Sequence, residues 1–222
     1  MRRLQFLTGN MGKLREAQYH FEQLGIEVVA LKVDGEVPII VEPQSDDLGS
    51  VSLAKLQQAK QFVGNDEMIM VEDSGLFVDA LNGFPGVYSS NALQTIGWGG
   101  LLKLLSHLES EDPHQNQRLR SAKFKSSVCL WDGSVVIQEQ GVCPGWITIH
   151  PTEGEGFGFD PVFAPYDLDD SGTALSAGIS GPISTHGVPF GGIELEEKQK
   201  FSHRQRALSA LVEKLRLSAE AS

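Results

Sequence analysis

The sequence predicts an α/β protein built on a mixed sheet, with a second lobe. In the first 80 residues, short strand-like runs alternate with stretches whose apolar residues recur at helical spacing. Further along, residues 123–131 and 134–140 flank Asp132-Gly133, a pair typical of a tight hairpin turn. Antiparallel strands inserted among strand–helix units make a sheet mixed, which favours a two-lobed α/β protein over a purely parallel fold.

The first half of the chain follows the strand–helix alternation. The predicted elements are a strand at 4–7, a helix from about 14 to a cap at Gly25, a strand at 26–31, an apolar run at 37–41, a helix from a cap at Asp46 or Asp47 to Gly64, and a strand at 68–71. The last strand runs into Glu72 and Asp73, and Ser74 with Gly75 is expected to turn the backbone there. A buried strand thus ends by presenting carboxylates.

The second half is less regular. The predicted elements are a helix at 95–108, an exposed connection at 109–117, the hairpin, a third strand at 141–149, an irregular excursion at 166–192, and a final helix capped by Ser202. The connection is expected to be exposed because it is polar and contains Pro113. The excursion is rich in Gly, Ser and Pro, and its sequence suggests no function.

Composition narrows the class of protein. The chain has 222 residues and a net charge of −11, which argues against binding a nucleic-acid backbone. No run resembles a signal peptide or a membrane span, so we expect a cytosolic protein with no membrane partner. Cys129 and Cys143 lack the spacing of a zinc site and are expected to be reduced, buried thiols. We expect a single domain, 1–222, with an antiparallel hairpin lobe at about 120–150.

Two segments have the residue types of a phosphate and metal site. Thr8-Gly9-Asn10-Met11-Gly12-Lys13 joins a strand to a helix, and the free N–H groups of a helix start, with Lys13 on its first turn, suit a phosphate. The alternative is a simple helix cap, since the Walker spacing is absent. Glu72 and Asp73 lie where open α/β sheets bind ligands. The alternative there is a solvated Asp-Ser-Gly turn.

Two further segments suit a planar, anionic ligand. Glycines alternate with aromatic residues at 154–161, so Phe157 or Phe159 has a ring available for stacking on a base. A glycine-bulged strand with core phenylalanines is the alternative. His203 and Arg204 lie in the first turn of the final helix, where cations oppose the helix dipole. A ligand explains that position better than helix stability does.

Taken together, the separated motifs closely resemble those of the inosine triphosphate pyrophosphatase family. The motifs are Thr8-Gly9-Asn10-x-x-Lys13, Glu72-Asp73-Ser74-Gly75-Leu76, Ala80-Leu81-Asn82-Gly83-Phe84-Pro85-Gly86, Gly156-Phe157-Gly158-Phe159-Asp160-Pro161 and Ser202-His203-Arg204. The resemblance implies an elongated mixed sheet flanked by helices, with two lobes around a central cleft, and a homodimer. It also implies magnesium-dependent hydrolysis of non-standard purine nucleoside triphosphates (ITP, dITP, XTP) to the monophosphate and pyrophosphate.

The resemblance also assigns roles to individual residues. Asp73 is expected to accept the proton of the attacking water and to bind magnesium, with Glu42 as a second metal ligand and Glu72 as a further one. The triphosphate-binding residues would be Thr8, Asn10, Lys13 and Ser74, with Lys13 also stabilising charge on the leaving group. The purine pocket would be formed by Phe157, Gly158, Phe159, Asp160, Lys198, His203 and Arg204.

The sequence departs from the family pattern near the expected base pocket. Gly191-Gly192 stand in place of a small residue followed by Glu, and Gln199 stands where Asn is usual. These changes leave open a related house-cleaning pyrophosphatase with another base preference. A nucleotide-binding regulator without turnover is a second alternative. The water-activating acid argues against the regulator, since binding alone does not require one.

Overall fold

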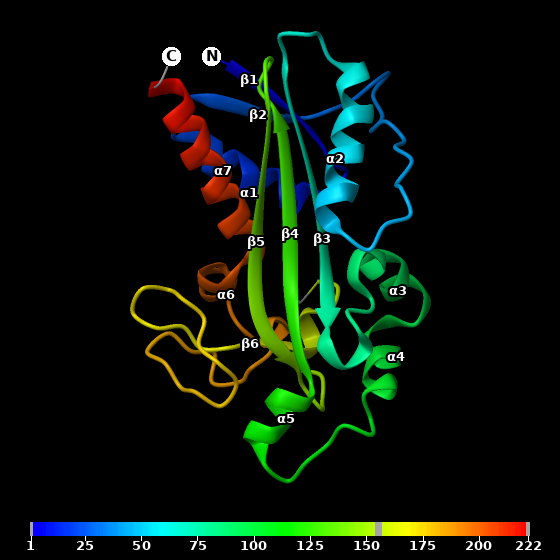
Figure 1. Cartoon of the computed structure of the whole chain (residues 1–222), viewed down its shortest axis with the longest axis vertical. Helices are drawn as coiled ribbons and strands as arrows, with labels where there is room; N and C mark the ends of the chain where they lie inside the picture. The colour runs from blue at the N-terminus through cyan, green and yellow to red at the C-terminus, as the bar shows by residue number, and fades with distance from the viewer. Residues whose placement is uncertain (1, 154–156, 221–222) are drawn as a thin grey trace. The chain divides into compact units, whose positions relative to one another are not determined.

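The computed structural model describes residues 2–153 and 157–220 (Figure 1). Its six-stranded sheet has the order β2-β1-β3-β4-β5-β6. The strands are β1 (Arg2–Leu7), β2 (Ile26–Ala30), β3 (Met68–Val78), β4 (Ser121–Trp131), β5 (Val136–Ile147) and β6 (Phe163–Pro165). The helices are α1 (Met11–Glu22), α2 (Leu48–Ala59), α3 (Ser89–Thr95), α4 (Gly97–Leu104), α5 (Pro113–Leu119), α6 (Leu195–Phe201) and α7 (His203–Glu220). The predicted α/β fold with a mixed sheet is confirmed: β1 pairs with β2 and β3 in parallel, whereas β5 and β6 are antiparallel.

The chain forms two compact units. The first comprises the described residues of 1–74, 126–141 and 204–222, and the second those of 75–125 and 142–203. Strands β3, β4 and β5 each begin in one unit and end in the other. Each unit has its own hydrophobic core, and each is described separately below.

The first unit is a three-layer arrangement in which helices cover both faces of the strands. Helices α1 and α7 lie on one side and α2 on the other (Figure 1). The strand period of two explains this division. In β3, Met68 and Met70 pack with α1 and α7, whereas Ile69 and Val71 pack with α2. The strand is therefore buried on both faces, as its continuous apolar run requires.

Side-chain caps fix the starts of the two helices that border the site. Asn10 caps α1, and its Oδ1 accepts hydrogen bonds from the backbone N–H of Gly12 (2.8 Å) and Lys13 (3.2 Å). The predicted cap of α2 is confirmed at Asp47, whose Oδ2 accepts from the backbone N–H of Ser50 at 2.7 Å. Each cap satisfies N–H groups that a helix start otherwise leaves unpaired.

The second unit has an aromatic core and a buried arginine. Phe163 and Phe190 pack together with a ring-centroid distance of 5.3 Å. Arg120 is 2% exposed, and its guanidinium donates to backbone carbonyls, among them those of Leu105 and Ile147, each at 2.7 Å. These bonds compensate for removing the cation from water and fix the loops around the aromatic core.

One prediction that concerns the site was wrong in detail. Strand β3 does not end at Val71 but continues through the acids to Val78, and Ser74-Gly75 forms no turn. The backbone N–H of Leu76 donates to Ser89 Oγ at 2.8 Å. Gly75 is needed for close approach instead, because a Cβ there would lie 2.2 Å from the carbonyl oxygen of Gly86.

Three further element predictions were also wrong. Residues 109–117 are not simply an exposed connection, because Pro113 is the first residue of α5 and Asp112 caps it. Proline suits that position because its missing N–H has no helical partner there. The expected third strand at 141–149 is the continuation of β5, and the helix at 95–108 is divided into α3 and α4 at Ile96-Gly97. Helix α6 was not predicted.

Within the described ranges, no helix is both long and apolar enough to cross a bilayer.

Candidate active site

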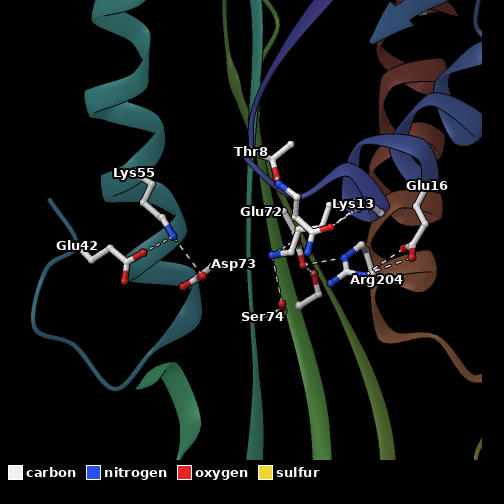
Figure 2. A network of polar contacts seen from close by, with 12 residues as sticks. Thr8, Lys13, Glu16, Glu42, Lys55, Glu72, Asp73, Ser74 and Arg204 are labelled. Carbon is white, nitrogen blue, oxygen red and sulfur yellow. Dashed lines mark hydrogen bonds and ion pairs between the residues drawn. The ribbon is translucent and has the colours of Figure 1, made fainter. Parts of the chain in front are cut away.

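The neighbouring acids Glu72 and Asp73 point to opposite faces of β3. Strand β1 pairs with β3 only as far as Leu7 opposite Val71, so both acids lie just beyond the end of that pairing. Alternation places Glu72 on the face of α1 and α7, and Asp73 on the face of α2. Figure 2 shows the two resulting groups of charged side chains, one on each side of the strand.

Glu72 lies in the first group, where two cations and a hydroxyl contact it. Its side chain is 1% exposed, and its oxygens lie 2.7 Å from Lys13 Nζ and 3.2 Å from Arg204 Nε. Ser126 Oγ donates to Glu72 Oε1 at 2.7 Å. Burial would raise the pKa of this carboxyl, but Arg204 and Lys13 together outweigh burial and hold the pKa well below its usual range. Glu72 is therefore ionised at neutral pH.

Asp73 lies in the second group, with Lys55 of α2 and Glu42. Lys55 Nζ is 2.6 Å from Glu42 Oε1 and 3.3 Å from Asp73 Oδ1 (Figure 2). Burial raises the pKa of Asp73, and the cations Lys55 and Lys13 offset this only in part. Burial would lower the pKa of Lys55, but Asp73 and Glu42 outweigh it and raise that pKa. Neighbouring acids thus have opposite pKa shifts.

Glu42 reaches this group because α2 holds the irregular segment before it. Gln58 accepts a hydrogen bond from the backbone N–H of Val41 (3.0 Å) and donates one to the Val41 carbonyl (2.7 Å). These paired bonds fix the backbone next to Glu42. The apolar run at 37–41 is not a strand, but an irregular segment that is hydrogen-bonded to a helix.

The donor set fits a magnesium ion that shares its coordination with phosphates. Among the described residues, no three His, Cys, Asp or Glu side chains form a metal-binding group by themselves. Glu42 and Asp73 nevertheless converge on one cation, the ammonium of Lys55. Magnesium is usually bound by one or two carboxylates together with substrate phosphates and water, so two converging carboxylates suffice.

The predicted phosphate-binding residues lie around the start of α1. Thr8 Oγ1 accepts a hydrogen bond from the backbone N–H of Asn10 at 3.1 Å, and Lys13 Nζ lies 3.5 Å from Ser74 Oγ. Not every expected N–H group is free, because Asn10 itself occupies those of Gly12 and Lys13. Cationic Lys13 therefore remains the main group for an anion in this segment.

The predicted base-binding residues of the second unit surround a buried carboxylate. Asp160 Oδ2 lies 2.5 Å from Lys198 Nζ and accepts a hydrogen bond from the backbone N–H of Phe157 at 2.9 Å. Phe157 is 74% exposed and available for stacking, whereas Phe159 is 4% exposed and belongs to the core. Between them, Gly158 has a φ of +68°, which favours glycine. Gly156 of the same motif lies outside the described residues.

The chain passes from the second unit to the first between His203 and Arg204. The His203 ring stacks on Phe124, with centroids 5.1 Å apart and an interplanar angle of 13°. Arg204 is held within the first unit by Glu72 and by Glu16, whose Oε2 lies 3.2 Å from Arg204 Nη1. Two acids therefore stabilise a cation that opposes the dipole of α7.

The sequence matches the Ham1 family model over residues 4–214, nearly the full chain. The chain belongs to the Ham1 family. The dITP/XTP pyrophosphatase of Thermococcus kodakarensis is 40% identical over 206 residues, which cover 93% of each chain. That of Methanopyrus kandleri is 36% identical over 209 residues, covering 94% of this chain and 93% of the relative.

Solved Ham1 structures share the fold. A HAM1 protein from Coxiella burnetii superposes with a TM-score of 0.74 at 25% identity, covering 97% of this chain and 98% of that one. A nucleoside-triphosphatase / dITP/XTP pyrophosphatase from Mycobacterium abscessus gives a TM-score of 0.64 at 27% identity, covering 94% and 98%. The predicted family is therefore confirmed by sequence and by structure.

Sequence reasoning missed several residues of this candidate site. They are Glu16, Lys55, Gln58 and Ser126. For Lys55 a signal existed, because Val51, Lys55 and Ala59 follow one another at intervals of four and so share the buried face of α2. A lysine in such a series indicates a buried partner. Ser126, which is fully buried in β4, gave no comparable signal.

Proposed function

We propose that this protein hydrolyses non-standard purine nucleoside triphosphates, namely dITP, XTP and ITP, to the monophosphate and pyrophosphate. Membership of the Ham1 family supports this activity, as do relatives that are dITP/XTP pyrophosphatases over nearly their whole length. The single observation that carries the chemistry is Asp73, a buried carboxylate of raised pKa beside Glu42 and Lys55. Such a group suits general-base work better than an exposed aspartate does.

The proposed mechanism divides the work between the two faces of β3. Asp73 accepts the proton of the water that attacks the innermost phosphorus. Glu42 and Asp73 would hold magnesium, which would neutralise phosphate charge and polarise the phosphorus when bound. Lys13, with Thr8, Asn10 and Ser74 around it, binds the triphosphate and stabilises charge on the leaving pyrophosphate.

Lys55 also has a role in the proposed mechanism. Its ammonium compensates the charges of Glu42 and Asp73, which would otherwise repel each other. It also adds a cation on the side of the strand where the phosphorus is attacked. Lys55 is therefore proposed as a further contact for the triphosphate.

Base selection is proposed for the second-unit residues with Arg204. Phe157 offers an exposed ring for stacking, and His203 or Arg204 would donate to the 6-oxo group of a hypoxanthine or xanthine base. Adenine has an amino donor at that position, so the same donors would remain unpaired. Discrimination against ATP follows from that mismatch.

A substrate panel tests the activity. Pyrophosphate release from dITP, XTP and ITP, compared with dATP and dGTP in the presence of magnesium, should be fast for the first three only. Asp73→Asn should lower kcat by about 1,000-fold, since general-base catalysis contributes roughly 10²–10⁴-fold. Asp79→Asn, the same change at a half-exposed aspartate, should leave turnover unaltered. Rapid turnover by Asp73→Asn would reject the assigned role.

We further propose that the protein is a homodimer and acts in the cytosol, where the purine nucleotide pool is found. Light scattering coupled to size-exclusion chromatography should give a mass about twice that of the 24.2 kDa chain. A mass that stays at one chain across micromolar concentrations would contradict the dimer. Cell fractionation tests the location.

A further inference from the structure

We propose that Glu72 is a positioning residue that holds Lys13 and Arg204 in place for the reaction, and that it is not a magnesium ligand. This inference rests on the proposed function, because it assigns Glu72 a task in that reaction. It replaces the sequence-based hypothesis that Glu72 joins Asp73 and Glu42 on the metal. Three structural observations carry it.

The first observation is that the carboxylate is buried and already contacts two cations and a hydroxyl. Lys13 Nζ lies 2.7 Å from Oε2, Arg204 Nε lies 3.2 Å from Oε1, and Ser126 Oγ donates to Oε1 at 2.7 Å. The Glu72 side chain is only 1% exposed. The carboxylate is thus shielded from solvent, and its charge is already balanced by two cations.

The second observation is the alternation along β3. Met68 and Met70 mark the face toward α1 and α7, and Ile69 and Val71 mark the face toward α2. Since successive side chains of a strand point to opposite faces, Glu72 faces away from Asp73. The strand itself thus separates Glu72 from the carboxylates that meet at Lys55 (Figure 2).

The third observation is that the Glu72 carboxylate connects cations from two different helices. Lys13 belongs to α1, next to the predicted triphosphate loop, and Arg204 belongs to α7 and to the predicted base-binding set. These two long, flexible side chains share one buried carboxylate, that of Glu72 on β3. Without that charge the two cations would repel each other and lose their fixed positions. Misplacement of a catalytic group by 1 Å can cost about 100-fold in rate.

Kinetics of Glu72→Gln test the proposal against a matched control. The variant keeps the shape and a hydrogen-bonding oxygen for Ser126 but loses the charge. We expect kcat to fall by about 100-fold, with KM changed less than about threefold, since Lys13 keeps its full attraction for phosphate. Glu139→Gln makes the same change at a glutamate whose side chain is 18% exposed and pairs with Lys214, outside the proposed site, and kcat should stay within about threefold of wild type. Equal losses in the two variants would overturn the proposal.

Metal binding gives a readout that is independent of turnover. Mn²⁺ binding to the substrate-free protein, followed by electron paramagnetic resonance, should be weakened by Asp73→Asn and by Glu42→Gln but not by Glu72→Gln. A loss of Mn²⁺ affinity in Glu72→Gln as large as that in Asp73→Asn would overturn the proposal.

A second, smaller substitution tests the proposal even if Glu72→Gln does not fold. Ser126→Ala removes only the hydroxyl that orients Glu72, and it should lower kcat about threefold. If Glu72→Gln folds, the added Ser126→Ala change should cost nothing further, because both act through one group. Wild-type kcat in Ser126→Ala would overturn the proposal. Inactivity of the wild type toward the whole substrate panel would instead reject the proposed function, so the two failures are distinguishable.

Discussion

At the scale of single residues, the central feature is that adjacent acids behave differently. Glu72 and Asp73 are both largely buried, and burial alone would raise both pKa values. Glu72 has a cation from each of two helices, and these hold its pKa well below the ordinary range. Asp73 shares its lysine with Glu42 and retains a raised pKa. Environment rather than residue type therefore separates the acid proposed to position cations from the acid proposed to accept a proton.

The depressed pKa of Glu72 predicts how stability depends on pH. Above its ordinary pKa of 4.5, Glu72 is ionised in the folded and the unfolded chain, and its stabilisation is fully present. Below 4.5 only the unfolded chain binds the proton, so this stabilisation is lost progressively as pH falls toward the folded-state pKa. Urea unfolding at a series of pH values should show the free-energy advantage of wild type over Glu72→Gln shrinking below pH 4.5. A constant difference down to pH 3 would contradict this.

At the scale of elements, the relative lengths of neighbouring strands create the site. β1 ends opposite Val71, whereas β3 continues to Val78. The acids thus lie on a strand that is still rigid but has lost its parallel neighbour on one edge. Rigid elements hold catalytic groups more precisely than loops do.

The sequence predicted these elements only where local chemistry decides them. Asp47 capped α2 as expected because capping depends on the side chain and the next few residues. The end of β3 was misplaced because the apolar run stops at Val71 while hydrogen bonding continues. That bonding depends on β4 and on Ser89, which are distant in sequence. The Glu72 ion pairs were missed for the same reason, since Lys13 and Arg204 are 191 residues apart.

Gly75 provides a test at this scale. Gly75→Ala places a Cβ 2.2 Å from the Gly86 carbonyl oxygen, a rigid backbone atom, so the backbone must shift. We expect the free energy of unfolding to fall by about 3 kcal/mol. Gly99→Ala in α4 meets nothing within 4 Å and should raise stability by about 0.5 kcal/mol. Denaturant titration measures both, and a neutral Gly75→Ala would contradict the close approach.

At the scale of the whole molecule, the acidic chain concentrates cations where the ligand should bind. The net charge is −11, yet Lys13, Lys55 and Arg204 are gathered within the first unit around Glu72 and Asp73. An acidic average repels nucleic-acid backbones, whereas local cations still attract a triphosphate. Family resemblance could predict the fold and the residue types of this site, but only the folded chain shows which acid each cation contacts.

The shared strands predict cooperative unfolding. Because β3, β4 and β5 each belong to both units, loss of either unit disrupts strands of the other. The tryptophans report separately, since Trp131 lies in the first unit and Trp98 and Trp146 in the second. Trp131→Phe leaves only the tryptophans of the second unit, and Trp98→Phe/Trp146→Phe leaves only that of the first. In each variant, the urea midpoint measured by tryptophan fluorescence should equal the midpoint measured by circular dichroism. Separate midpoints within one variant, by fluorescence and circular dichroism, would show independent units.

Because Glu72 and Asp73 point to opposite faces of β3, insertions or deletions of an odd number of residues should have a different effect from those of an even number. Insertion or deletion of one residue just before the acids would exchange their sides, sending Glu72 toward Lys55 and Asp73 toward Lys13 and Arg204. A change of two residues would shift both acids along the strand but return each to its own side. In directed evolution of this chain, active variants should therefore contain insertions of one residue in β3 less often than insertions of two residues.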